Sequence, residues 1–368
     1  MAVSRINEAG LNVNQYGNRN LVINGAMKVA QRATSFASVS SGEAYTVDRF
    51  GRYINAAGTW TITQSTDTPT GQGFATSIKF DCTTANGSLS ASSEYLFFQR
   101  FEGQDLQRLK KGTANAEKVT LSFWVKSAKT GTYITELYDN NNSRHISRAY
   151  TISSANTWEK KILTFDGDTT GAITDNNSTS IQLNFMLANG SNWTSGTLQT
   201  SWGANTQANR AVGQVNLADS TSNDWYLTGV QLEVGDTATD FEHRSYGDEL
   251  AKCQRYYHRV DSFGTFGNEA YKRYGNGVYY ATTAAEVMIP LPVMMRAEPT
   301  FENTGTSTDY AFYDGTVRSI SSSLAINAAS DPNYMVITGI TASTTLGNGA
   351  VFLSNNNTNS FIAANAEL

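Results

Sequence analysis

The sequence predicts an all-β fold built from antiparallel strands. Charged residues make up only 16% of the 368 residues, against roughly 25% in an ordinary globular domain. Long solvated helices depend on Glu, Lys and Arg, whereas Thr, Tyr, Val and Phe suit half-buried strands. Short apolar runs that alternate with polar residues recur between turn clusters rich in Ser, Thr, Asn and Gly. Together these features predict a β-sandwich of the jelly-roll type.

The length of the chain predicts more than one folded unit. A single hydrophobic core stops growing at roughly 250–300 residues, and this chain has 368. Because 40% of the residues are hydrophobic and 11% aromatic, the chain can bury sizeable cores. We therefore expect one large and one small β domain.

Residues 1–19 are predicted to form an N-terminal attachment arm. They are polar, contain two Gly and four Asn, and follow neither the period of a strand nor that of a helix. A monomer gains nothing from ordering such a tail, so we expect another protein to hold it. No basic region precedes an apolar stretch and no run of 18 apolar residues occurs, so we expect synthesis in a cytoplasm and no membrane insertion.

Residues 20–246 are predicted to form the jelly roll. Most of the apolar runs here place apolar side chains on one face and polar ones on the other, as in an antiparallel strand with one buried face. Examples are Leu21–Ile23, Trp60–Ile62, Ser77–Phe80, Val119–Val125 and Ile181–Met186. Trp60, Trp124 and Trp225 lie within such patterns, so we expect them in the core.

Residues 247–258 are predicted to form a linker helix. Asp248 can cap its start, and the side chains of Leu250, Cys253 and Tyr257 share one helical face. Strand patterns then resume, and residues 259–368 are predicted to form a smaller C-terminal β domain.

Composition and local motifs argue against several classes of function. The net charge is −5 and no basic stripe occurs, so we expect no nucleic-acid partner. The three His and two Cys cannot be arranged as a closed zinc site, and the local signatures of nucleophilic and zinc hydrolases are missing. Cys82 and Cys253 lie far apart, and we do not expect a disulfide. We therefore expect no enzyme activity, no metal and no cofactor.

Acidic residues leave two alternatives open. Glu94, Glu102 and Asp105 lie close in sequence, and a glycosidase needs two carboxyl groups about 5–10 Å apart. Asp139–Ser143 and Asp166–Asp168 carry oxygen side chains that could reach one calcium ion. Neither segment has the Gly and distal Glu spacing of an EF-hand, so hairpin turns and solvated carboxylates are the favoured interpretations.

Glycan binding requires aromatic faces for the apolar side of a sugar ring and polar groups for its hydroxyls. The predicted candidates are Trp193, Trp202, Tyr138, Tyr310 and Tyr313, because these aromatic residues lie in or beside turn-rich segments. Two alternatives compete with ligand contact. A loop aromatic can fold back over the end of a sandwich, and exposed residues of the second domain can lie in an oligomer interface.

Several blocks of the sequence resemble a jelly-roll module found in bacteriophage tail fibres and related virion proteins. The blocks are Asn20–Arg32 with Val47–Phe50, Phe98–Leu106 leading to Val119–Ser127, Leu227–Gly235 with Ala238–Glu242, Arg244–Tyr257, and the terminal Ala363–Leu368. They cover most of the chain in order. They identify a virion module and not a ligand.

This resemblance implies a tail-fibre or receptor-binding component. The arm would attach to other virion proteins, a jelly roll like a carbohydrate-binding module would face host-surface polysaccharide, and the chain would form a homotrimer. The chain lacks the collagen-like, coiled-coil or β-helical stalk of longer members. That departure favours the alternative of a head, neck or tail decoration or adaptor protein that binds no glycan. A polysaccharide depolymerase is the third interpretation.

Overall fold

The computed structural model describes residues 18–260, 265–266, 268–322 and 324–368. It divides into two compact units on either side of the bond between Tyr246 and Gly247. Residues 1–17 of the predicted arm lie outside the described residues. All strand pairings among the described residues are antiparallel. The predicted all-β, antiparallel fold class is therefore confirmed.

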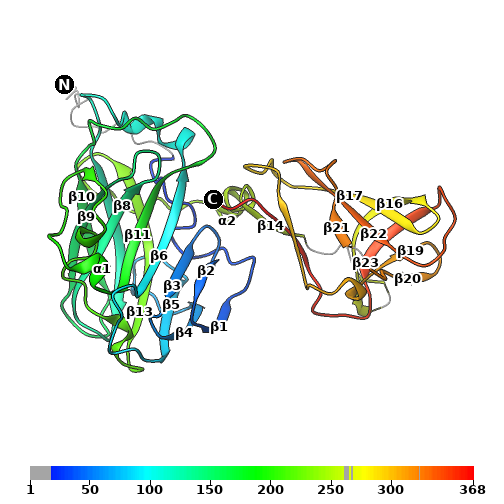
Figure 1. Ribbon diagram of the computed structural model, residues 1–368, viewed down its shortest axis with the longest axis horizontal. Helices are drawn as coiled ribbons and strands as arrows, with labels where there is room; N and C mark the ends of the chain where they lie inside the picture. The colour runs from blue at the N-terminus through cyan, green and yellow to red at the C-terminus, as the bar shows by residue number, and fades with distance from the viewer. Residues whose placement is uncertain (1–17, 261–264, 267, 323) are drawn as a thin grey trace, which may run out of the picture. The chain divides into compact units, whose positions relative to one another are not determined.

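The first unit is a sandwich of a six-stranded and a seven-stranded sheet (Figure 1). The six-stranded sheet has the order β1 (Ser35–Val39), β4 (Thr59–Ser65), β5 (Ser77–Thr84), β13 (Asp224–Val234), β7 (Val119–Ser127), β10 (Glu159–Phe165). The seven-stranded sheet has the order β12 (Gly203–Ala204), β9 (Arg144–Ile152), β8 (Gly131–Asp139), β11 (Thr179–Asn189), β6 (Glu94–Glu102), β3 (Gly51–Asn55), β2 (Gly42–Tyr45).

Aromatic rings from both sheets meet in the core of this sandwich. Phe80 on β5 lies 4.9 Å from Phe97 on β6, and Trp225 on β13 lies 5.9 Å from Phe185 on β11, measured between ring centroids. All four side chains are fully buried. Edge-to-face and tilted rings at these separations add to the hydrophobic stabilisation of the core. The two sheets therefore share one interior, and their other faces point outward.

The expected core positions of the tryptophans are correct for Trp60 and Trp225, which are fully buried, and wrong for Trp124. Trp124 is half-buried and lines a hollow of about 200 Å³ together with Phe74 and Phe241. The reason is the period of two along β7, which sends its neighbours into the core and Trp124 to the outer face.

Helical segments are few and short in the described residues. They are 3₁₀-helices η2 (Gly103–Leu109), η3 (Gln207–Asn209), η4 (Leu217–Asp219) and η5 (Ser307–Asp309), and α-helices α1 (Ser191–Thr194) and α2 (Tyr246–Gln254). The predicted linker helix exists as α2, but its predicted boundaries of 247–258 are wrong. The chain enters β14 at Tyr257, whose backbone pairs with Asn365, so tertiary strand pairing ends the helix before Tyr257. Asp248 lies in the first helical turn instead of at the cap.

The second unit contains two further sheets. The three-stranded sheet has the order β14 (Tyr257–Val260), β24 (Ile362–Asn365), β18 (Thr300–Asn303). The eight-stranded sheet has the order β20 (Val317–Ser319), β19 (Tyr310–Tyr313), β23 (Gly349–Ser354), β16 (Asn268–Ala281), β17 (Ala284–Pro290), β22 (Tyr334–Ile340), β21 (Leu324–Ile326), with β15 (Thr265–Phe266) paired to β16. The second unit has its own core, which includes Tyr310, Phe312, Ile337 and Phe352. Cys82 and Cys253 are both buried.

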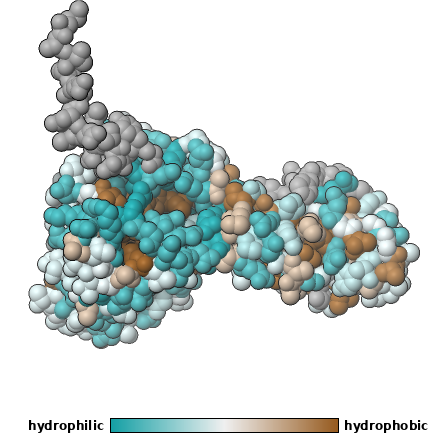
Figure 2. All heavy atoms as spheres, turned by 90° about the horizontal axis from the view of Figure 1, so that it is seen from above, coloured by the Kyte–Doolittle hydropathy of each residue, from teal (hydrophilic) through white to brown (hydrophobic). Residues whose placement is uncertain are grey.

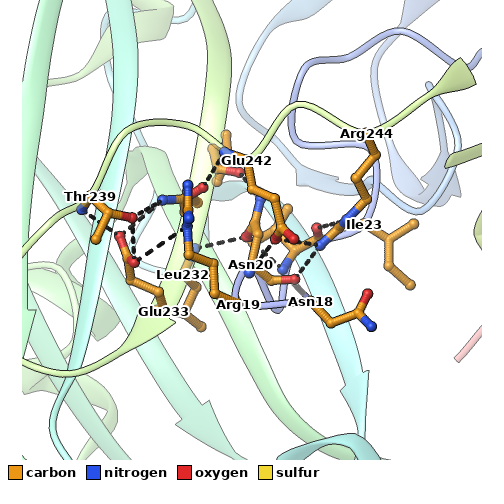
Figure 3. A network of polar contacts seen from close by, with 12 residues as sticks. Asn18, Arg19, Asn20, Ile23, Leu232, Glu233, Thr239, Glu242 and Arg244 are labelled. Atoms are coloured by element: carbon orange, nitrogen blue, oxygen red, sulfur yellow. Dashed lines mark hydrogen bonds and ion pairs between the residues drawn. The ribbon is translucent and has the colours of Figure 1, made fainter. Parts of the chain in front are cut away.

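A polar clasp ties together the two ends of the first unit (Figure 3). The backbone N–H of Asn20 donates to Glu242 at 2.7 Å, and Arg244 donates to the carbonyl oxygen of Asn20 at 2.5 Å. The side chain of Asn20 also accepts from the N–H of Leu232 at 3.1 Å. Arg19 donates to the carbonyl of Asp240 at 2.5 Å. The chain therefore enters the sandwich next to the point at which it leaves.

Apolar side chains interrupt the mostly hydrophilic surface of both units (Figure 2). Large exposed examples are Ile162 in the first unit and Met288, Met294 and Leu346 in the second. Among the residues that the structure describes, no helix is long and apolar enough to span a bilayer.

Candidate functional site

The outer face of the seven-stranded sheet carries a groove of about 290 Å³, which we call the sheet groove. Strands β2, β3, β6, β8 and β11 supply most of its lining. The turn after β8 supplies Asn140, and the loop after η3 supplies Arg210. The lining residues are Glu43, Tyr53, Glu94, Leu96, Phe98, Arg100, Tyr138, Asn140, Gln182 and Arg210. This set mixes aromatic rings with charged and amide side chains.

Strand β6 is the middle one of the five strands that line the groove, and both of its faces carry large side chains. Tyr95 and Phe97 point into the sandwich core, whereas Leu96 and Phe98 pack in a separate cluster on the outer face. Opposite Phe98 on β3 stands Gly51, where a Cβ atom would lie only 2.4 Å from the Phe98 ring. The missing side chain at Gly51 therefore lets the Phe98 ring lie across the neighbouring strand.

A row of polar side chains crosses the sheet beside these rings. Arg100 donates two hydrogen bonds to Glu43, at 2.7 and 2.9 Å, and a third to Gln182 at 2.9 Å. Gln182 in turn donates to Asn184 at 2.7 Å. Each of these side chains is therefore held in one orientation before any ligand arrives.

The row continues to a buried ion pair. Asn184 donates to Glu136 at 2.8 Å, and Arg210 holds both oxygens of Glu136 at 2.8 and 2.7 Å. Glu136 is fully buried. Burial alone would lower the pKa of Arg210, but the attraction and hydrogen bonds of Glu136 outweigh it and hold that pKa above its usual value. Arg210 therefore stays charged, and its guanidinium lies against the carboxyl of Glu136.

The cations of the row also cover aromatic rings. The guanidinium of Arg100 lies 4.5 Å from the ring centre of Phe98, and that of Arg210 lies 4.8 Å from the ring centre of Tyr138. Such cation–π contacts fix both partners. The groove thus offers apolar ring surface next to preorganised hydrogen-bonding groups, the combination that small polar ligands with apolar faces require.

Glu94 stands apart from the paired charges of the groove. Burial raises its pKa to about 7, partly opposed by Arg210 and assisted by the negative charge of Glu136. A carboxyl with this pKa exists in both protonation states near neutral pH.

Of the five predicted aromatic residues, the structure places Tyr138 in the groove and Trp193 beside it. Tyr138 is half-buried near the end of β8 and lines the groove. Trp193 belongs to α1 and packs with Leu96 and Phe98 in the outer cluster. Its expected exposure is wrong, because only 7% of Trp193 is accessible. The side chain covers apolar surface of the sheet, as a loop aromatic often does.

The structure does not bring the other three predicted residues to the groove. Trp202 is half-buried, donates from its indole N–H to the carbonyl of Asp166 at 2.7 Å and packs under Lys111. Tyr310 is fully buried in the core of the second unit, so its expected exposure is wrong. Alternation along β19 directs Tyr310 and Phe312 inward. Tyr313 is half-buried on the same strand.

Glu94 and Glu102, which are close in sequence, do not converge. Glu94 and Glu102 lie at opposite ends of β6, so about eight strand steps, roughly 26 Å, separate their backbones. Glu102 is fully buried and accepts a hydrogen bond from Gln104 at 2.6 Å. A glycosidase pair of Glu94 and Glu102 would need a spacing of about 5–10 Å, which this strand excludes.

The two candidate cation loops share one lysine. Lys111 forms ion pairs with Asp139 and, at 2.9 Å, with Asp168. Arg144 adds hydrogen bonds to both oxygens of Asp168 at 2.8 and 2.9 Å. Burial opposes ionisation of Asp168, but these partners outweigh it and hold its pKa below the usual value. The described residues contain no cluster of three or more His, Cys, Asp or Glu side chains that could hold a metal ion.

Most of the groove residues were not among the predicted site residues. The available signal was β6 itself, where Leu96 and Phe98 add apolar surface to a face that ordinary alternation would make polar. Arg210 and Gln182 carried no local signal, because their role depends on strands that are distant in sequence.

Comparison with known proteins gives likeness in structure only. No protein-family model matches the sequence, and no curated protein matches it. The enzymatically active domain of tailspike protein 4 from bacteriophage CBA120 is similar over 59% of this chain and 21% of its own, with 14% identity and a TM-score of 0.31. The chain thus spans about a fifth of that tailspike chain.

Two further solved structures are similar over comparable stretches. A putative sugar binding protein from Bacteroides thetaiotaomicron shares 12% identity over 58% of this chain and 99% of its own, with a TM-score of 0.31. The family 11 carbohydrate-binding module from Clostridium thermocellum, solved with a β-1,3-1,4-mixed-linked tetrasaccharide, shares 11% identity over 56% and 99%, with a TM-score of 0.28. Likeness at this level says nothing about what this chain binds.

Proposed function

We propose that the protein is a virion component that binds a host-surface glycan in the sheet groove. The observation that carries this proposal is the pairing of the Tyr53, Phe98 and Tyr138 rings with a fixed polar row. A sugar ring presents an apolar face to aromatic side chains and hydroxyls to amides and charged groups. Because Arg100 and Gln182 are already held, binding costs little side-chain ordering.

The virion context of this proposal is supported by the sequence blocks that resemble phage tail-fibre modules. In this proposal residues 1–19 attach the protein to other virion proteins. The clasp at Asn20 supports this role, because it fixes the point at which the arm leaves the sandwich.

The proposal also includes a homotrimer, with the second unit as its assembly surface. Val278, Tyr280, Met288 and Ile340 are 37–58% exposed and belong to the adjacent strands β16, β17 and β22. Exposed apolar side chains gathered on one sheet face are typical of an interaction surface. Three linked grooves would raise the effective concentration of weak sugar contacts on a repetitive polysaccharide.

Glycan binding is tested with the full-length protein on an array of bacterial surface polysaccharides. We expect saturable binding that falls about tenfold or more in Tyr138→Ala and Gln182→Ala, since stacking and polar contacts contribute about 1–2 kcal/mol each. The matched control is Trp158→Ala, a half-buried aromatic next to Tyr226 of the six-stranded sheet. Equal losses of glycan affinity in all three variants, or no glycan binding by the folded oligomer, would contradict the proposal that the groove is the binding site.

The alternative of a head, neck or tail adaptor predicts a different result. It predicts no binding on the array together with labelling of purified particles by an antibody against the protein. The oligomeric state is measured by light scattering, where we expect Met288→Lys to dissociate the trimer. The control Leu346→Lys, at an exposed apolar residue outside β16, β17 and β22, should leave the trimer intact.

A further inference from the structure

The carboxyl of Glu94 is the acidic group of the sheet groove that lacks a protein partner. The lining also contains Glu43, which is bonded to Arg100. Beneath the groove, Glu136 is bonded to Arg210. Among the described residues, none donates a hydrogen bond to the Glu94 carboxyl or forms an ion pair with it.

Two further polar groups without partners are buried on the same face of the sheet, below the residues that line the groove. Asn189 on β11 stands directly opposite Glu94 on β6, so both side chains leave the sheet on the same face. Asn189 is only 7% exposed, yet neither its amide oxygen nor its amide nitrogen has a hydrogen-bond partner. The indole N–H of Trp193, in the helix that follows β11, is also buried without a partner. Buried polar groups are normally satisfied, and each exception calls for an explanation.

We propose that the carboxyl of Glu94, which lines the sheet groove directly opposite the buried Asn189, is a subsite for the hydroxyl groups of an uncharged sugar, and that binding there strengthens as the pH rises through neutrality. This inference rests on the glycan-binding function proposed above. The ionised carboxyl accepts hydrogen bonds from two hydroxyls, and such charge-assisted bonds are about twice as strong as neutral ones. The amide atoms of Asn189 lie buried below the lining, so the sugar contacts of this subsite are those of Glu94.

The charge balance of the groove selects for an uncharged ligand. The cations of the lining are Arg100 and Arg210, and each is already paired with a glutamate. A uronic or sialic acid would therefore bring its carboxylate to the unpaired Glu94 without a free cation to balance it. A neutral sugar meets no such repulsion.

The pH dependence of sugar binding is assigned to Glu94, which has other titratable side chains around it. Strand β3 contributes the phenol of Tyr53, strand β8 contributes Glu136, and the loop after η3 contributes Arg210. Asn189 and Trp193 do not titrate. Burial raises the pKa of Glu94 to about 7, and Arg210 holds both oxygens of Glu136.

The experiment measures affinity of the full-length protein for a neutral polysaccharide from the array, and for polygalacturonate, at pH 5.5 and 8.5. If ionised Glu94 binds the sugar tenfold more tightly than protonated Glu94, affinity rises about eightfold between these pH values. We expect Glu94→Gln to weaken binding at pH 8.5 and to abolish the rise. The matched control is Glu117→Gln, at an exposed carboxylate outside the groove, which should behave as the unchanged protein.

A second measurement is independent of the variants. The ¹³C signal of the Glu94 carboxyl is titrated with and without a neutral oligosaccharide, and we expect the sugar to lower its pKa. Three results would each overturn this inference. They are preferential binding of polygalacturonate over the neutral polymer, a pH profile of Glu94→Gln that equals that of the unchanged protein, and the same titration of the Glu94 carboxyl with and without the sugar. If Tyr138→Ala still loses binding, the proposed function survives that result. No binding of any glycan would overturn both.

Discussion

The ion pair between Arg210 and Glu136 makes the strongest prediction for a single residue. Glu136 is fully buried and Arg210 is 15% exposed at its side chain. Removing one member of a buried pair leaves an uncompensated charge and costs about 3–5 kcal/mol. We therefore expect Arg210→Gln to lower the free energy of unfolding of the first unit by about 3 kcal/mol in urea titrations.

The control for this prediction is Lys110→Gln. Lys110 forms an ion pair with Glu117 at 2.6 Å, but both side chains are more than a third exposed, and such pairs contribute about 1 kcal/mol or less. Adding Glu136→Gln to Arg210→Gln should recover part of the lost free energy of unfolding, because the buried carboxylate without a partner is then removed. Similar losses for Arg210→Gln and Lys110→Gln would contradict this account.

Glu94 gives a prediction on stability that needs no ligand. Its pKa rises from 4.5 to about 7 on folding, so the folded state binds the proton more tightly than the unfolded state. The contribution of Glu94 to the free energy of unfolding is therefore complete below about pH 4, and it is lost as the pH rises through 7. After allowance for partial solvent screening, we expect Glu94→Gln to be about 2 kcal/mol more stable than the unchanged protein at pH 8. Urea unfolding at pH 4.5 should show little difference, and an equal gain at both pH values would exclude this origin.

The sequence predicted the type of side chain in the groove better than it predicted the exposure of each candidate. The search for aromatic side chains near turns found Tyr138, which lines the groove. The same search chose Trp193 and Tyr310, which are buried. Turn-forming residues predict the local conformation of the backbone, whereas the accessibility of a side chain depends on segments that are distant in sequence. The partner of Glu136 could not be predicted for the same reason, since Arg210 lies 74 residues away.

At the scale of elements, the contact between Gly51 and Phe98 predicts an effect on both stability and binding. A Cβ atom at Gly51 would lie 2.4 Å from the Phe98 ring, so Gly51→Ala must displace that ring. Overpacking of this kind costs about 1–3 kcal/mol. We expect Gly51→Ala to reduce stability in urea and to weaken glycan binding.

The matched control is Gly42→Ala on the neighbouring strand. Nothing lies within 4 Å of a Cβ atom at Gly42, but its φ of +74° disfavours a side chain. This variant should lose stability through backbone strain without moving Phe98. Unchanged glycan binding in Gly51→Ala would show that the Phe98 ring does not touch the ligand.

Strands were predicted well and the ends of elements less well. The alternating run Val119–Val125 lies within β7, because a strand with one buried face imposes a period of two on its own sequence. The helix prediction ran past Gln254 to residue 258, because Cys253 and Tyr257 share a helical face. The pairing of Tyr257 with Asn365 overrides that local pattern. Pairing across more than 100 residues leaves no trace in a short window of sequence.

For the whole molecule, the two separate cores predict two unfolding transitions in calorimetry. Phe97 is buried in the core of the first unit and Ile337 in that of the second. Truncation of a buried side chain to Ala costs about 2–5 kcal/mol. We expect Phe97→Ala to lower one transition temperature and Ile337→Ala to lower the other. A single transition lowered by both variants would mean that the units unfold together.

The clasp between Asn20, Glu242 and Arg244 has a consequence for how such a module can spread among genes. Because both ends of the sandwich lie at one spot on its surface, the intervening coding segment can be spliced into an exposed loop of an unrelated protein without stretching that loop. Folds with adjacent termini tolerate such insertion best. A sandwich closed in this way is therefore portable, and recombination can exchange it as one cassette.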